Sequence, residues 1–83
     1  MYKQIFTKPF LSDVKAVKKD KNLINRLHGK IDAILENPEH YKPLKHKLKG
    51  KRRAHIGHYV VLFEVKGSEV IFHRFKHHDD VYK

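Results

Sequence analysis

Apolar side chains recur with a helical period in the N-terminal half of the chain and predict two amphipathic helices there. A short alternating segment, residues 2–7, precedes them and predicts a strand. One apolar stripe covers residues 10–17, and a second covers residues 23–35 for about four turns until Asn37-Pro38 stops it. Two such helices, joined by a short break at residues 20–22, predict an antiparallel hairpin with one shared apolar face. We expect this face to pack against a sheet.

In the C-terminal half, apolar and polar side chains alternate with the two-residue period of β-strands. A loop at residues 38–50 comes first, and its expected anchors are Tyr41, Leu44 and Leu48. Three strands are predicted after it, at roughly residues 52–56, 59–65 and 69–75. The two separators are of hairpin length and contain Gly57 and Gly67, which can adopt positive φ.

The element order is therefore βααβββ. It predicts an α+β fold in which a two-helix hairpin packs on one face of a small, mainly antiparallel sheet. With 83 residues, the chain has room for one domain, which spans 1–83. The expected core includes Val61, Leu62, Phe63 and Phe72.

Charge and composition limit the cellular setting and the partners. Lys and Arg number 19 against 9 Asp and Glu, a formal net charge of +10, and such a surplus favours an acidic partner. Cysteine is absent, so neither disulfides nor thiolate zinc ligation is expected to hold the fold. The N-terminus lacks a signal peptide's apolar run, and no stretch of about 18 apolar residues occurs, which predicts a cytoplasmic protein without a membrane partner.

A run of basic residues between positions 42 and 53 predicts contact with phosphates. Seven Lys and Arg side chains occur there without an Asp or Glu. Such a run is often a solvated surface, but its one-sided sign and the net charge favour nucleic acid, because neutralised phosphates release counterions. With two residues from the last strand added, the expected RNA-binding set is Lys45, Lys47, Lys49, Lys51, Arg52, Arg53, Arg74 and Lys76.

Histidine is concentrated in the strand region, where five of the chain's eight lie between positions 55 and 78. A single histidine is most often a surface or core residue, and imidazole can also give and take a proton near neutral pH. Hairpin pairing predicts a cluster at one rim, because His55 ends one strand, His58 begins the next, and His77 and His78 end the last. Tyr82 is a candidate for stacking on RNA bases. The alternative is that its ring packs at the edge of the hydrophobic core.

Clustered imidazoles beside cations match the needs of a ribonuclease that works without metal. The substrate's 2′-hydroxyl attacks the phosphorus, while the protein supplies a base, an acid for the leaving oxygen and cations for the developing charge. No cofactor and no small-molecule ligand are expected for this mechanism. The alternative is a metal site, for which His55-x-x-His58 and His77-His78-Asp79-Asp80 offer ligand types but no recognised spacing.

Two motifs give the chain a family resemblance. The strand and turn at residues 53–65 contain R-x-x-x-G-x-Y, and residues 77–82 read H-x-x-x-V-Y at what is expected to be the end of the final strand. Together with the βααβββ order, they resemble the RelE/ParE superfamily of bacterial and archaeal toxins over nearly the whole chain. The resemblance implies a toxin that cuts mRNA in the ribosomal A site and is silenced by a cognate antitoxin, for which an acidic, amphipathic chain is the expected complement.

The chain departs from the RelE pattern at two positions, since Val60 and His78 stand where RelE has arginines. It resembles the YafQ-like branch more, in which histidines carry the chemistry. His55 matches that branch's mid-strand histidine, His78 its C-terminal histidine and Tyr82 its terminal aromatic. His58 stands where the branch has aspartate. The expected catalytic set is His55, His58, His77, His78 and Tyr82. Two alternatives stay open, a ParE-like gyrase poison and a degraded toxin that only binds RNA or its antitoxin.

Overall fold

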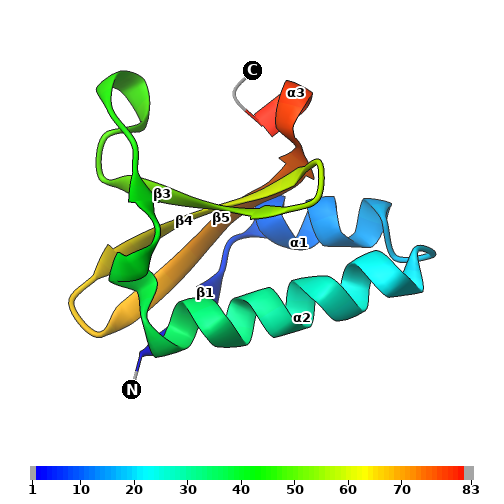
Figure 1. Ribbon diagram of the computed structural model, residues 1–83, viewed down its shortest axis with the longest axis horizontal. Coiled ribbons are helices and arrows are strands. Elements are labelled where there is room, and N and C mark those ends of the chain that lie inside the picture. Colours follow the sequence, from blue (N-terminus) through cyan, green and yellow to red (C-terminus); the bar gives the residue numbers. More distant parts are fainter. Residues whose placement is uncertain (1, 82–83) are drawn as a thin grey trace.

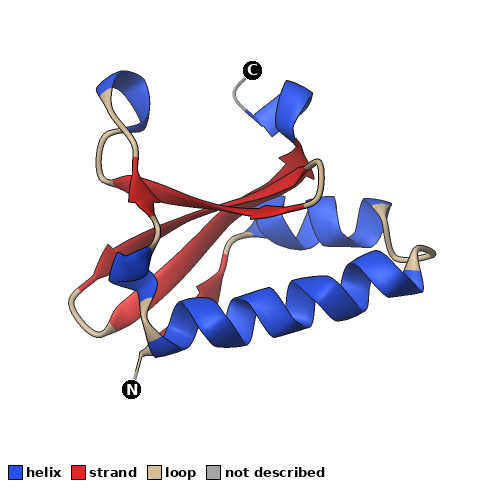
Figure 2. Cartoon of the chain, in the orientation of Figure 1, coloured by secondary structure: helices blue, strands red, loops and turns tan. Residues whose placement is uncertain are grey.

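The computed structural model describes residues 2–81, and its architecture confirms the predicted α+β fold (Figures 1 and 2). The elements follow in the order β1 (Lys3–Phe6), α1 (Lys8–Ala16), α2 (Lys21–Glu36), η1 (Pro38–His40), β2 (Lys42–Pro43), η2 (His46–Leu48), β3 (Lys51–Ile56), β4 (Tyr59–Lys66), β5 (Glu69–His77) and α3 (His78–Val81). No helix within residues 2–81 is long and apolar enough to cross a lipid bilayer.

The strands form one five-stranded sheet in the order β1-β5-β4-β3-β2. β1 pairs with β5 in parallel, and every other pairing is antiparallel. Gly57 and Gly67 have φ of 57° and 59° in the two hairpin turns, where glycine avoids the steric cost of a left-handed backbone. Figure 1 shows α1 and α2 below the sheet, with α3 and the green η2 segment above it. We call the upper side the open face.

Both long helices begin at a side-chain cap, and α2 begins earlier than its apolar stripe predicts. Thr7 Oγ1 accepts a hydrogen bond from the Phe10 amide at 3.2 Å, and α1 begins at Lys8. Asp20 Oδ1 accepts one from the Leu23 amide at 3.0 Å. Residues 20–22 were expected to interrupt the helical pattern, but Asp20 caps α2 and Lys21 already belongs to it, because a capping carboxylate satisfies otherwise unpaired amides.

The main core lies between the helical hairpin and the sheet. It contains the predicted Val61, Phe63 and Phe72, and Tyr41 packs against it. Leu62 is buried too, but in a second cluster on the open face with Val60 and Val81, against which the predicted anchors Leu44 and Leu48 pack. The expected loop at residues 38–50 therefore contributes to both apolar clusters, the main core and the one on the open face. It contains the short segments η1, β2 and η2.

The chain end differs from the prediction. The final strand was expected to close at about residue 75 and to carry residues 77–82 at its end, whereas β5 continues to His77 and the chain then turns into α3. Val81 explains the change of direction, because the helical turn brings this apolar side chain onto the open face. Burial of such a side chain stabilises the fold by roughly 1.5–3 kcal/mol.

The buried carboxylate of Asp13 accepts hydrogen bonds from the part of β5 that has no pairing with β1. β1 pairs only with Glu69–Phe72, and beyond it Asp13 of α1 lies beside the strand. Its Oδ2 accepts hydrogen bonds from Phe75 N at 3.0 Å and Arg74 Nε at 2.8 Å, and its Oδ1 accepts one from Arg74 Nη2 at 3.0 Å. Asp13 therefore joins α1 to the sheet and satisfies a buried amide.

Replacing Asp13 is expected to destabilise the protein. Asp13→Ala leaves the Phe75 amide unsatisfied and should lower the free energy of unfolding by about 2–3 kcal/mol. Urea denaturation followed by circular dichroism measures the change, with Asp32→Ala on the exposed side of α2 as the matched control. The control should change stability by no more than about 0.5 kcal/mol. Equal effects of the two substitutions would contradict this role of Asp13.

Candidate functional site

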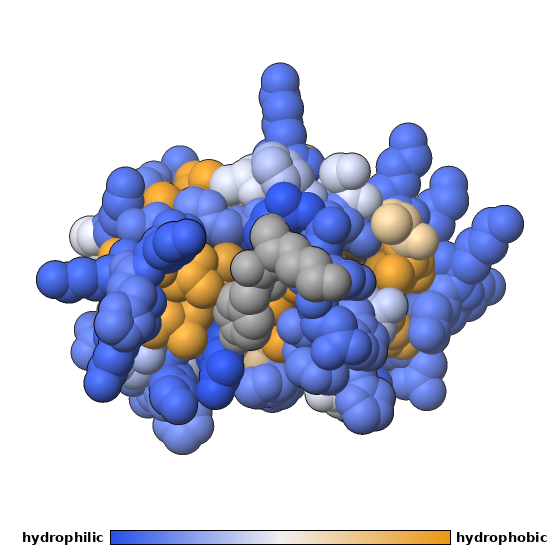
Figure 3. Space-filling view, turned by 90° about the horizontal axis from the view of Figure 1, so that it is seen from above, coloured by the Kyte–Doolittle hydropathy of each residue, from blue (hydrophilic) through white to orange (hydrophobic). Residues whose placement is uncertain are grey.

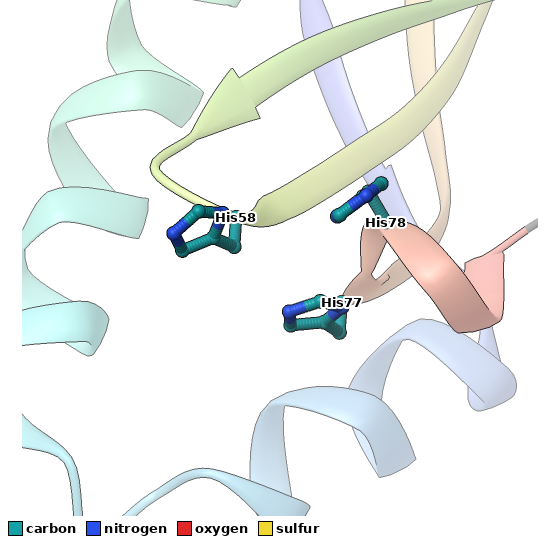
Figure 4. A group of neighbouring side chains, drawn as sticks. All are labelled: His58, His77 and His78. Carbon is teal, nitrogen blue, oxygen red and sulfur yellow. The ribbon is translucent and has the colours of Figure 1, made fainter.

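Three histidines meet at one rim of the sheet (Figure 4). His58 lies in the β3–β4 turn, His77 is the last residue of β5, and His78 begins α3. One ring nitrogen from each lies within 4.8 Å of one from each of the others. Ring centroids are 5.9 Å apart for His58 and His77, 6.3 Å for His58 and His78, and 4.9 Å for His77 and His78. We call this group the histidine rim.

Strand pairing creates the histidine rim. Tyr59 is the Cα partner of His77, so the residue before it, His58, lies next to the end of β5. The His78 amide donates a hydrogen bond to the His58 carbonyl at 2.8 Å, which fixes the start of α3 against the turn. The Tyr59 ring packs on Phe75 and meets the His77 ring edge-on at 5.8 Å. His77 is half-buried, whereas His58 and His78 are exposed.

Asp79 contacts two of the imidazoles. Its Oδ1 lies 3.0 Å from His78 Nε2, and its Oδ2 lies 3.5 Å from His77 Nδ1. The carboxylate can orient the His78 ring, and the backbone amide of Asp79 donates a hydrogen bond to His77 Nδ1 at 3.3 Å. Sequence reasoning considered Asp79 only as a metal ligand and missed this contact. The helical turn that begins at His78 brings the carboxylate back to its neighbours.

His55 does not join the histidine rim as the strand positions suggested. It pairs with Val60, is exposed, and lies between the buried Ala54 and Ile56. Because side chains alternate along a strand, His55 points to the open face, opposite the main core. Tyr82, the other predicted catalytic residue, lies outside the described residues.

The open face combines an apolar floor with basic side chains. Cα pairing places Arg53 and Leu62 on one side of the sheet, and Val60 and Lys76 on that same side. Lys45, Lys47 and Lys49 are exposed on the segment around η2, which crosses above this face. In Figure 3, seen from above, hydrophilic side chains surround smaller apolar areas. This arrangement can hold a polyanion over an apolar surface.

Two of the arginines predicted to bind RNA hold other parts of the fold. Arg74 is paired with Asp13, and this hydrogen bond raises the pKa of its guanidinium. Arg52 Nη1 donates to the carbonyls of Glu39 at 3.3 Å and Tyr41 at 2.8 Å, which holds the loop against β3. Charge counting could not reveal these roles, because the acceptors come from distant positions in the chain.

Glu64 places a carboxylate among the basic side chains of the open face. Glu64 Oε1 lies 2.8 Å from His73 Nε2, and Lys51 is its Cα partner on β3. The hydrogen bond from His73 lowers the pKa of Glu64, with Lys66 and Lys51 acting in the same direction against the opposing effect of burial. A lowered pKa means that this contribution to stability is present at neutral pH and is lost as the pH falls through that pKa. Lys51 is therefore partly neutralised by its neighbour.

The fold and the basic open face define a small toxin of the RelE/ParE superfamily. The chain belongs to the ParE toxin family of type II toxin–antitoxin systems, whose family model matches residues 5–82.

Similar proteins agree with this assignment. A protein assigned as toxin RelE4 from Methanocaldococcus jannaschii is 40% identical over 72 residues, which cover 83% of this chain and 77% of that protein. The crystal structure of YafQ from E. coli strain BL21(DE3) has the same fold, with a TM-score of 0.83, 21% identity and complete coverage of both chains. YafQ in the E. coli DinJ–YafQ complex gives a TM-score of 0.77 at 21% identity, again over both whole chains.

The turn that carries His58 provides a test of how the rim is built. Gly57→Ala places a side chain at φ 57°, 3.6 Å from Arg26 Nη1, and should cost about 1–2 kcal/mol of stability. Gly29→Ala in α2 meets no atom within 4 Å and should stabilise the protein by about 0.5–1 kcal/mol. Urea denaturation measures both changes, and NMR signals of the His58 ring should shift only for Gly57→Ala. Equal signs for the two stability changes would rule out this account of the turn.

Proposed function

We propose that this toxin is a ribosome-dependent endoribonuclease that cleaves mRNA by acid/base catalysis without a metal cofactor. The observation that carries the proposal is the histidine rim, three imidazoles and a carboxylate at the border of a basic face. A phosphodiester of RNA can be cleaved by imidazoles alone because its own 2′-hydroxyl is the nucleophile. Membership of a toxin family agrees with an attack on an essential process of the cell.

The proposed reaction uses two imidazoles in opposite roles. One removes the proton of the 2′-hydroxyl as the bond from the 2′-oxygen to phosphorus forms, and another protonates the 5′-oxygen as its bond to phosphorus breaks. His78 is the better placed of the exposed pair, because Asp79 contacts its Nε2 at 3.0 Å and can orient the ring. His58 and His77 supply the neighbouring ring. The products are a 2′,3′-cyclic phosphate and a 5′-hydroxyl.

Binding is assigned to the open face. Exposed Lys45, Lys47 and Lys49, with Arg53 and Lys76, supply cations for the phosphates. His55 lies on the same face and is proposed to contact the RNA there, away from the reacting bond. Tyr82 remains a candidate for stacking on a base.

The proposed partner that silences the toxin is a cognate acidic antitoxin in the cytoplasm. The formal net charge of +10 favours an acidic chain. The apolar cluster around Leu62 and Val81 lies between basic segments, a combination that an amphipathic acidic segment complements. The complex of YafQ with DinJ agrees with a partner of this kind for a toxin of this fold.

Gyrase poisoning is the second candidate, because the matching family model describes ParE toxins. It requires no histidine chemistry, so the two functions predict different products. A translating extract to which the purified toxin is added should yield new mRNA 5′ ends inside open reading frames if the first proposal holds. Cleaved DNA trapped on gyrase, with mRNA left whole, would replace the first proposal with the second.

Removing His78 should slow mRNA cleavage strongly. His78→Ala is expected to lower the rate at which new 5′ ends appear in the translating extract by about 100-fold or more, the usual size of an acid/base contribution. His28→Ala on the exposed side of α2 is the matched control and should cleave at the wild-type rate. Circular dichroism and antitoxin binding should be unchanged in both variants. A wild-type rate for His78→Ala would remove His78 from the proposed mechanism.

Ribosome binding should weaken with salt through the lysines around η2. Each lost contact with a single-stranded phosphate flattens the plot of log affinity against log salt by about 0.7, so removing three should flatten it by about 2. The triple variant is Lys45→Ala, Lys47→Ala and Lys49→Ala. Its control, Lys15→Ala, Lys18→Ala and Lys19→Ala, removes the same charge from exposed positions on the helical side. Identical slopes for the two triple variants would place the binding surface elsewhere.

A further inference from the structure

The histidine rim has the composition and spacing of a metal site. Its members come from three different elements, the β3–β4 turn, the end of β5 and the start of α3, and their ring nitrogens lie within 4.8 Å of one another. Ligand nitrogens around one tetrahedral zinc ion lie roughly 3.3 Å apart, since each bond is about 2.0–2.1 Å long. We propose that His58, His77 and His78 together bind one divalent late transition metal ion, Zn²⁺ or Cu²⁺.

Small side-chain movements are enough to bring the three imidazole nitrogens to bonding distance of one ion. The largest nitrogen separation would shrink by about 1.5 Å, which modest changes of side-chain torsion provide. His58 and His78 are exposed, so solvent gives the ion an entry path and leaves their rings room to turn. The His77 ring is half-buried and edge-on to Tyr59, so it forms the fixed member of the site.

The donor set selects the class of ion. Three neutral imidazoles are borderline-soft nitrogen ligands, which suit Zn²⁺ and Cu²⁺ and bind Mg²⁺ or Ca²⁺ poorly. Asp79 Oδ1 contacts Nε2 of His78 at 3.0 Å, so Nδ1 of that ring can ligate. A carboxylate that holds a ligating imidazole fixes its tautomer and strengthens the metal bond. The fourth position of a tetrahedral ion can take water.

The proposal concerns binding and stands apart from the proposed cleavage reaction. An ion on these nitrogens would occupy the lone pairs that the reaction uses, so it would act as an inhibitor and not as a cofactor. Spacing along the sequence could not reveal the site, because the hydrogen bond from the His78 amide to the His58 carbonyl brings the ligands together across two strands.

Metal titration of the untagged, chelator-treated full chain tests the site. Calorimetric titration with Zn²⁺ alone should show one ion per chain. His58→Ala and His78→Ala should each weaken binding at least tenfold, and Asp79→Asn should weaken it by roughly tenfold through the lost support of the His78 ring. His28→Ala, which removes an exposed imidazole from α2, should bind Zn²⁺ like the wild type. Circular dichroism checks that each variant is folded.

Paramagnetic resonance of the wild-type protein loaded with one equivalent of Cu²⁺ provides evidence that needs no variant. Coupling to three imidazole nitrogens supports the site, and coupling to fewer than three overturns it. Absence of Zn²⁺ binding by the wild type, or equal Zn²⁺ affinity for His58→Ala, His78→Ala and His28→Ala, would also overturn it. Loss of cleavage activity plays no part in these outcomes, so the metal site and the proposed reaction can fail independently.

Discussion

Burial of β4 on both faces is the constraint on which the rest of the structure depends. Residues 60–63 are all buried, whereas a strand with one solvated face would alternate. Val61 and Phe63 pack in the core under the helices, so Val60 and Leu62 need cover on the opposite side. That cover comes from Leu44, Leu48 and Val81. The same apolar contacts hold the lysine-bearing segment around η2 and the end of α3 over the open face.

An irregularity in the β4–β5 pairing sets the position of the histidine rim. Leu62 pairs with Arg74, but Phe63 pairs with Phe72, so His73 is an extra residue in β5. A bulge of this kind shifts the register by one, and each shift of one residue moves side chains to the other face. Beyond the bulge, His77 lies opposite Tyr59 and beside the turn that carries His58. The bulged residue is also used, since His73 pairs with the carboxylate of Glu64.

The basic residues divide between holding the fold and facing solvent. Arg74 completes the buried hydrogen bonds of Asp13, and Arg52 binds two backbone carbonyls of the loop. Guanidinium groups suit these tasks because they present several donors in a fixed plane. The exposed cations around η2 are lysines, which are flexible and bind phosphate as point charges. The surface proposed for RNA is therefore less basic than the composition suggests, and its positive charge is concentrated around η2.

Local patterns in the sequence were enough to predict β1, the two long helices and strands β3 to β5 in their order, and the hairpin turns at Gly57 and Gly67. They also predicted three members of the rim, His58, His77 and His78. Helical period and turn chemistry depend on residues a few positions apart, so they can be read from one chain. Tertiary structure alone decided that His55 faces away from the rim, that Asp13 takes Arg74, and that α3 follows β5. Each of these depends on the register of strands or on the burial of groups distant along the chain. Such pairings are determined by the packing of the whole molecule, because the free energy of burying an apolar or polar group depends on neighbours that the local sequence does not specify.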